Sequence, residues 1–175
     1  MQQRLVPSSL EFSQERLHEL VDMELLSQEE ADKIFQESPF HSQEDIRSGR
    51  LWTVTVPLKH SDGGVSPLLG SWGGESAYFY LSDKSLAARL KNLGLPRIIE
   101  IETALSDGLN AFSASSTVLE AWARKLGVSV VPTGCDLAIT KCLGTAEIVR
   151  VHTEGESTFD EVAKTYPEGM SGDVT

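Results

Sequence analysis

The residues with the clearest chemical potential lie in one stretch, Gly70 to Leu81, which reads GSWGGESAYFYL. Gly73 and Gly74 separate Trp72 from a carboxylate, and glycines allow positive φ or a close approach of the backbone to a ligand. Glu75 therefore stands between a flexible turn and the aromatic run 78–80, whose side chains favour a β-strand. This pattern is typical either of a ligand site or of the entry to a hairpin.

Two cysteines and a histidine form a second group with possible chemistry. Cys135, Cys142 and His152 match no compact zinc spacing, because a fourth ligand must come from far along the chain. A cysteine hydrolase built from Cys135, Asp136 and His152 is an alternative, although the sequence has no Gly-x-Ser-x-Gly elbow. Two cysteines in this setting favour reduced thiols over a disulfide framework.

The composition indicates a globular protein of one domain. The chain has 175 residues, 40% hydrophobic and 23% charged, which is enough for one substantial core. No apolar run approaches the roughly 20 residues of a membrane-spanning helix, and the N-terminus lacks the apolar segment of a secretory signal. We expect a cytoplasmic protein with no membrane partner.

The net charge of −11 is concentrated at the two ends of the chain. Residues 1–48 carry −7, residues 49–151 carry +1 and residues 152–175 carry −5. The middle segment is therefore the one suited to an anionic ligand. Clustered lysines and arginines are missing, so we expect no nucleic-acid partner.

Residues 1–48 are predicted to form an N-terminal helical cap. Ser13 is expected to cap a first helix, and Ser27 with Glu30 forms a capping box that opens a second helix, which Pro39 ends. Later helices are expected to begin at Ser82 or Asp83, at Thr117 and at Thr158. The first of these three is expected to close at Gly94 in the left-handed C′ position.

Five strands are predicted from short β-favouring runs: 51–57, 77–81, 97–103, 128–131 and 147–151. Their alternation in polarity favours antiparallel pairing over a buried parallel sheet. We therefore predict a single α+β domain, with the helical cap 1–48 on a mixed, mainly antiparallel twisted sheet in the core 49–166, followed by a mobile tail 167–175. Residues 133–146 fit either a helix or a strand.

In the order of their motifs and in the residue types of these motifs, residues 49–163 resemble the ADP-ribosyltransferase superfamily, including its small bacterial toxin-like members of the RES type. An arginine heads an aromatic first strand, RLWTV from Arg50, and the WGGESAYFY element from Trp72 follows it. A strand with the sequence PRIIEI comes next, and a late strand, EIVRV, is headed by Glu147. Thr145 stands where arginine-targeting members carry Glu or Gln, and their Ser-Thr-Ser element is absent.

The resemblance implies a split antiparallel sheet with NAD, as substrate, in a cleft. Arg50 would meet the pyrophosphate with its planar donor set. Trp72, Gly73, Gly74, Tyr78 and Tyr80 would flank the nicotinamide. Glu147 would hold the ribose 2′-hydroxyl and stabilise the oxocarbenium-like ribose as nicotinamide leaves, for the electrostatic reason that glycosidases use carboxylates. Glu75, beside the nicotinamide, is the second candidate catalytic carboxylate.

Two functions follow as hypotheses. The first is NAD-dependent ADP-ribosyl transfer to a protein or small-molecule acceptor, or NAD glycohydrolysis, in a toxin-like effector. The alternative is a non-enzymatic acidic binding module, such as an inhibitor or immunity protein, whose charge speeds encounter with a basic protein partner.

Overall fold

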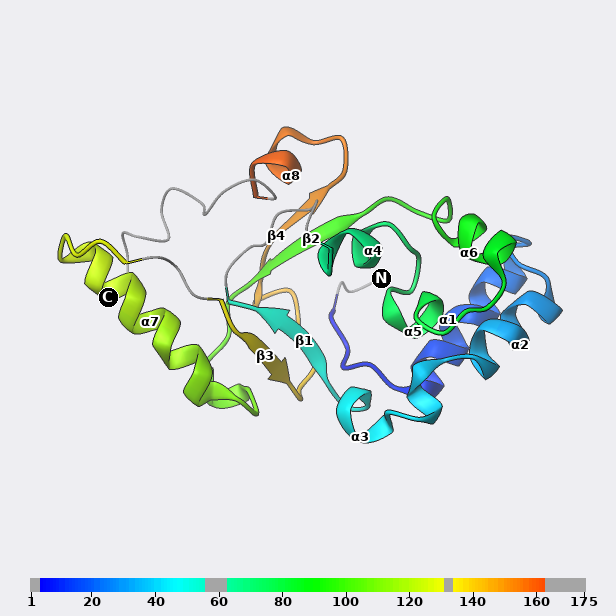
Figure 1. The fold of residues 1–175 in the computed structure, drawn as a ribbon, viewed down its shortest axis with the longest axis horizontal. Helices are drawn as coiled ribbons and strands as arrows, with labels where there is room; N and C mark the ends of the chain where they lie inside the picture. Colours follow the sequence, from blue (N-terminus) through cyan, green and yellow to red (C-terminus); the bar gives the residue numbers. More distant parts are fainter. Residues whose placement is uncertain (1–3, 56–62, 131–133, 163–175) are drawn as a thin grey trace. The chain divides into compact units, whose positions relative to one another are not determined.

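The computed structural model describes residues 4–55, 63–130 and 134–162 (Figure 1). The end of the first predicted strand at Pro57 and the predicted tail 167–175 lie outside these residues. The chain divides into two compact units. We call Ser8–Arg50 with Ser61–Arg97 the helical unit, and Met1–Pro7 with Leu51–His60 and Ile98–Thr175 the sheet unit.

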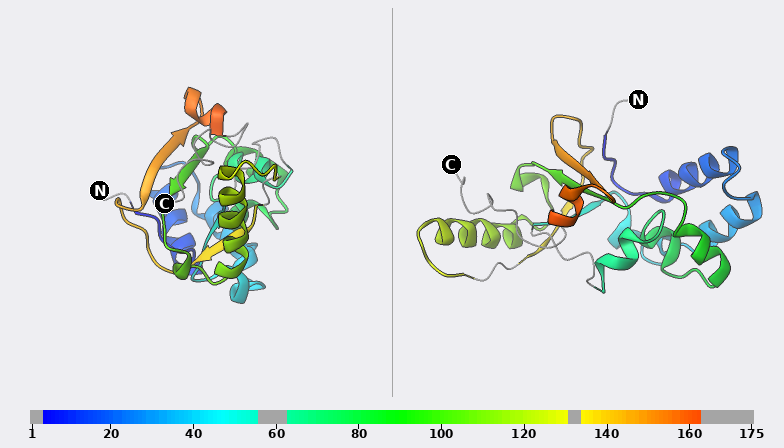
Figure 2. Two further views of the ribbon diagram at one scale, coloured as in Figure 1. Left: turned by 90° about the vertical axis from the view of Figure 1, so that its left-hand side faces the viewer. Right: turned by 90° about the horizontal axis from the view of Figure 1, so that it is seen from above.

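Two amphipathic helices begin the helical unit and lie side by side (Figure 2). Helix α1 spans Leu10–Asp22, and α2 spans Gln28–Gln36. The Ser27 hydroxyl accepts a hydrogen bond from the Glu30 N–H, and the Glu30 carboxylate accepts one from the Ser27 N–H. This capping box satisfies two N–H groups that the first helical turn leaves without partners, as the sequence predicts.

Short helices complete this unit. They are the 3₁₀ turn η1 (Pro39–His41), α3 (Glu44–Arg47), α4 (Val65–Leu69), α5 (Glu75–Tyr78) and α6 (Lys84–Leu90). Apolar residues of α5 and α6 join those of α1, α2 and the turn between these two helices in one core cluster, made of Leu17, Leu20, Leu26, Ala31, Ile34, Ala77, Leu86 and Leu90. Because α5 is a single turn, it depends on this packing rather than on its own helix propensity.

The described strands of the sheet unit form two separate pairs. Strand β1 (Leu51–Val54) runs antiparallel to β3 (Asp136–Ile139), and Trp52 is opposite Ala138. Strand β2 (Arg97–Ile101) pairs with β4 (Ile148–Thr153). Figure 1 shows β1 and β3 side by side, although they lie far apart in the sequence.

Helices border these strands. They are the 3₁₀ turn η2 (Leu105–Asp107), the long helix α7 (Ala111–Lys125) and α8 (Ser157–Val162). The core of the unit is a small cluster of Ala114, Leu137, Ile139 and Leu143. Leu5 joins it through a pair of backbone hydrogen bonds with Leu143 of 2.8 and 2.9 Å.

The α+β class that the sequence predicts is confirmed, whereas several local predictions are wrong. Residues 77–81 form no strand, because α5 and a bend occupy them, and residues 128–130 are not strand either. Helix α7 begins at Ala111, so Thr117 lies inside it. Gly94 does not adopt positive φ.

The cap of α1 is also displaced from its predicted position. Ser9, in extended conformation, accepts the hydrogen bond from the Phe12 N–H at 3.0 Å, and Ser13 lies one turn inside the helix. The serine that caps a helix is the one whose own backbone stays extended. Composition alone does not distinguish these two serines.

This difference gives a direct test. We expect Ser9→Ala to lower the free energy of unfolding by about 1 kcal/mol, because it removes the N-cap acceptor. Ser13→Ala is the matched control and should change it by less than about 0.5 kcal/mol, since alanine favours a helix interior. Urea denaturation followed by circular dichroism measures both, and equal losses would contradict the assignment.

Candidate functional site

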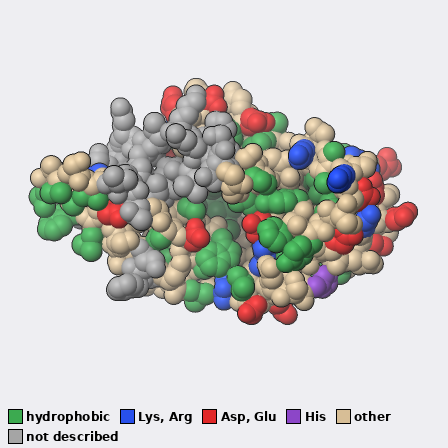
Figure 3. Space-filling view, viewed as in Figure 1, with side chains coloured by type: hydrophobic (Ala, Val, Ile, Leu, Met, Phe, Trp, Pro, Cys, Tyr) green, Lys and Arg blue, Asp and Glu red, His purple; other side chains and the backbone are tan. Residues whose placement is uncertain are grey.

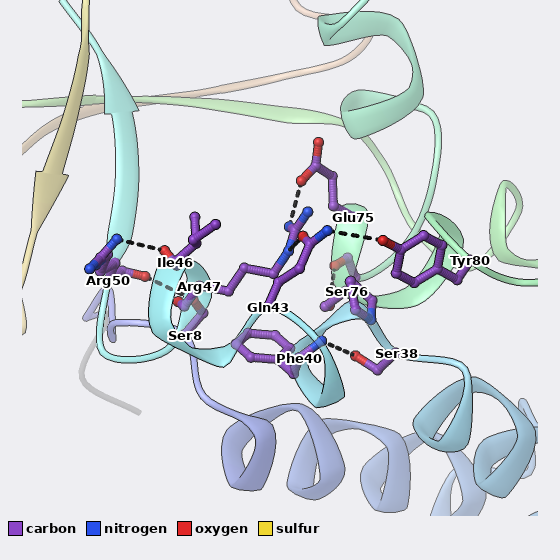
Figure 4. A network of polar contacts seen from close by, with 12 residues as sticks. Ser8, Ser38, Phe40, Gln43, Ile46, Arg47, Arg50, Glu75, Ser76 and Tyr80 are labelled. Atoms are coloured by element: carbon purple, nitrogen blue, oxygen red, sulfur yellow. Dashed lines mark hydrogen bonds and ion pairs between the residues drawn. The ribbon is translucent and has the colours of Figure 1, made fainter.

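The Glu75 carboxylate is the best-held charged group of the predicted site. Its Oε2 atom lies 2.5 Å from Nη1 of Arg47, whose side chain is only 18% exposed. The Arg47 Nε–H donates to Oε1 of Gln43 at 2.7 Å, which fixes the plane of the guanidinium. The second carboxylate oxygen of Glu75 points away from Arg47 (Figure 4). A carboxylate with one oxygen held and one presented can stabilise a nearby positive charge.

Aromatic side chains surround this ion pair. The Phe79 ring lies 5.3 Å from the Arg47 guanidinium, within the range of a cation–π contact. Tyr80 stacks edge-to-face on Phe79, with 5.0 Å between the ring centroids, and its hydroxyl accepts a hydrogen bond from Gln43 at 2.9 Å. Phe79 and Tyr80 therefore contact α3 and its N-cap residue from the bend that follows α5, and not from a strand.

The glycine pair forms a sharp turn before α5. Gly73 has φ +75° and Gly74 has φ +55°, a region that side chains other than hydrogen rarely allow. A Cβ on Gly73 would lie 2.9 Å from the Cβ of Ala77, and the Ser76 hydroxyl donates to the Gly73 carbonyl at 2.6 Å. The turn places Glu75 at the first position of α5. Trp72, Gly73 and Gly74 line a hollow of about 270 Å³ in the helical unit.

Arg50 contacts one residue that is close to it in the chain and one from the start of the helical unit. Its Nη1–H donates to the Ile46 carbonyl at 3.0 Å, and its carbonyl accepts from the Ser8 N–H at 2.9 Å (Figure 4). It therefore stands just before β1, next to the C-terminal end of α3. Arg50, Trp72–Glu75, Tyr78 and Tyr80 all belong to the helical unit.

Glu147 belongs to the sheet unit and precedes β4. Its Oε2 atom accepts a hydrogen bond from the Gly144 N–H at 2.9 Å, and its N–H donates to the Gly144 carbonyl at 3.3 Å. The side chain thus closes the turn that leads into β4, and it is half-buried. This local role requires no ligand.

Cys135 and His152, the residues of the alternative cysteine hydrolase, contact different residues in the structure. The Cys135 Sγ atom lies 3.5 Å from the Thr55 hydroxyl, whereas Nε2 of the buried His152 lies 3.1 Å from Oε1 of Glu100. Within the described residues, no group of three His, Cys, Asp or Glu side chains is arranged to hold a metal ion. The histidine and the cysteine are therefore engaged separately.

The sequence pattern indicates the Glu75 carboxylate as a site residue, but it does not indicate Arg47, the arginine that holds it. Arg47 lies 28 residues before Glu75, and an arginine at the end of a short acidic helix is typical of a solvated surface. Lys91 and Arg97, which line the hollow together with Trp72, were missed as well. No short-range pattern indicates any of the three.

Comparisons with protein-family models, with curated proteins and with solved structures found no match to this chain. None of the helices in the described part of the chain is long and apolar enough to cross a membrane.

Tyr78 reports on the charges of this site. Burial raises its pKa above the ordinary tyrosine value, the negative charge of Glu75 raises it further, and the positive charge of Arg47 lowers it. Because the folded state holds this proton more tightly than the unfolded chain, the stability from this group falls as pH rises through the raised pKa.

We expect Glu75→Gln to lower the pKa of Tyr78 and Arg47→Met to raise it. Burial remains in both variants, so the pKa should stay above the ordinary tyrosine value. Absorbance titration of tyrosinate measures it, and the same titration in Tyr78→Phe isolates this residue from the other two tyrosines. Identical titration curves in the native chain and both variants would show that the ion pair is not beside Tyr78.

Proposed function

We propose that the chain binds NAD and breaks its nicotinamide–ribose bond, either transferring ADP-ribose to an acceptor or hydrolysing NAD. The observation that carries this proposal is the Glu75 carboxylate, held at one oxygen by Arg47 and placed directly after the Trp72–Gly74 turn. The two separate strand pairs of the sheet unit also support it, because the resemblance in the sequence implies a split sheet.

The chemistry requires a negative group beside the ribose. As the bond from C1′ to nicotinamide breaks, its electron pair leaves with nicotinamide and positive charge develops on the ribose. Glu75 supplies an anion at a fixed position, so its electrostatic effect needs no reorganisation during the reaction. Water or an acceptor nucleophile then bonds to C1′ and loses its proton to solvent.

Two carboxylates are candidates for this role, and they differ in how they are held. Glu75 is fixed by a side chain from another helix, whereas Glu147 is hydrogen-bonded to the backbone of its own turn. We assign the principal role to Glu75. Glu147 remains the candidate that the resemblance supplies.

Release of nicotinamide from labelled NAD tests the proposal. We expect Glu75→Gln to lower the rate at least 100-fold, on the order of the loss when one electrostatic group is removed from an active site. Glu44→Gln is the matched control, since Glu44 is an exposed carboxylate on α3, and it should leave the rate unchanged.

The outcomes separate the alternatives. A loss in Glu147→Gln but not in Glu75→Gln would move the catalytic role to Glu147. No nicotinamide release by the native chain, with or without a protein acceptor mixture, would exclude the enzymatic function.

An acidic binding module is the second candidate. Exposed carboxylates follow α1, α2 and the turn between them: Glu11, Glu15, Glu19, Asp22, Glu24, Glu29 and Asp32. A surface of this sign attracts a basic partner over a distance set by the ionic strength. Salt-sensitive binding of a basic protein by a chain that does not turn over NAD would favour this function.

A further inference from the structure

The hollow of the helical unit is built from two stretches of chain. Residues 68–74 form one wall and residues 90–97 contribute the other. The Trp72 N–H donates to the Leu90 carbonyl at 3.0 Å, which ties the two walls together. The hollow therefore belongs to a hydrogen-bonded part of the fold.

The charged residues that line the hollow are all basic. They are Lys91, the C-cap of α6, and Arg97, the first residue of β2. No described residue of the lining is acidic. Among the described residues, neither side chain has an ion-pair partner, and both are exposed.

This arrangement is unusual for the helical unit, whose other cations largely pair with carboxylates. Lys33 pairs with Asp83 at 3.1 Å, Arg47 with Glu75, and Arg89 with Glu30. In a chain with a net charge of −11, two basic side chains on one hollow with no acid beside them make a local site of positive potential. Figure 3 shows basic side chains on the face that carries α6.

The rest of the lining is apolar or bare backbone. Trp72 packs against the core cluster of the unit and also lines the hollow, so its ring is held in place. Leu68 and Leu95 are 45% and 62% exposed, which leaves apolar surface at the rim. Glycines at positions 70, 73, 74 and 94 let a ligand approach the backbone closely.

We propose that this hollow binds a nucleoside diphosphate, with the phosphates on Lys91 and Arg97 and the base against Trp72. Lysine and arginine bind phosphate through charge-assisted hydrogen bonds, and an aromatic ring can stack on a nucleobase. A hollow that offers both groups can therefore bind a ligand that contains both a phosphate and a base. The volume of about 270 Å³ lies near the lower end of ligand pockets, which fits a mononucleotide better than a whole dinucleotide.

The proposal deepens the proposed function, since NAD contains an ADP moiety, and in that respect it rests on that function. The hollow would hold the ADP half. The remainder of NAD would continue past Gly74 to Glu75, the next residue in the chain. Binding of ADP alone, however, requires no turnover and can be tested separately.

Calorimetry with ADP as the probe tests the site. We expect Lys91→Gln/Arg97→Gln to weaken ADP binding about tenfold or more, because charge-assisted hydrogen bonds are lost. Lys84→Gln is the matched control, since Lys84 is an exposed lysine at the start of the same helix that does not line the hollow. Binding should weaken as salt rises in the native chain and depend less on salt in the double variant.

Further probes separate the two halves of the ligand. Adenosine and pyrophosphate should each bind more weakly than ADP, because each lacks one of the two contacts. ADP should change the tryptophan fluorescence of the native chain and not that of Trp72→Phe. The folding of the three variants, namely the Lys91→Gln/Arg97→Gln double variant, Lys84→Gln and Trp72→Phe, can be checked by circular dichroism before titration.

The results distinguish this inference from the proposed function. ADP binding that depends on Lys91 and Arg97, without nicotinamide release, would support the site and exclude the enzyme. Nicotinamide release that is unaffected in the double variant would support the enzyme and overturn the site. A native chain that does not bind ADP, or a double variant that binds it as tightly as the native chain, would also overturn the site.

Discussion

The Arg47–Glu75 ion pair is the interaction on which the candidate site depends. It joins two segments of the helical unit that are far apart in sequence, the end of α3 and the start of α5. Both helices have only four residues, so neither is stable as an isolated helix. Because Arg47 is mostly buried and also bound by Gln43 and Phe79, the pair has a defined geometry, and the desolvation of its charges is compensated by several contacts.

The ion pair also determines what the glycine turn can do. Gly73 and Gly74 reverse the chain so that Trp72 packs on the core while Glu75 meets Arg47. A side chain at Gly73 would collide with Ala77, which is itself buried in the core cluster. The turn, the buried alanine and the ion pair therefore constrain one another. Glu75 thus meets an arginine that also contacts the Phe79 ring.

The sequence correctly predicts the elements that depend on interactions between residues close together in the chain. The Ser27–Glu30 box needs only four residues, and β1, β2 and β4 follow β-favouring runs. The prediction of a strand at 77–81 was wrong because Ala77 is buried against α2 and the Tyr80 hydroxyl is hydrogen-bonded to Gln43. These tertiary contacts override the β propensity of the aromatic residues. Strand β3 could not be assigned because its identity comes from pairing with β1, whose residues lie between 82 (Val54 to Asp136) and 88 (Leu51 to Ile139) positions earlier in the chain.

The candidate site was predictable to a similar extent. Glycines, a tryptophan and a carboxylate in one stretch are visible in the sequence, and they do lie together. The basic residues of the site were not predictable. The helices of this unit are acidic, and in the sequence each of its lysines and arginines looks like an ordinary solvent-exposed residue. Only the fold reveals that Lys33 and Arg89 are paired with acids, whereas Lys91 and Arg97 share a hollow without one. The net charge of the chain does not distinguish the basic residues that are paired with acids from those that line the hollow. A strongly acidic chain can therefore contain a site for an anion, because binding depends on the charges within a few ångströms of the ligand, beyond which solvent and salt screen the remainder.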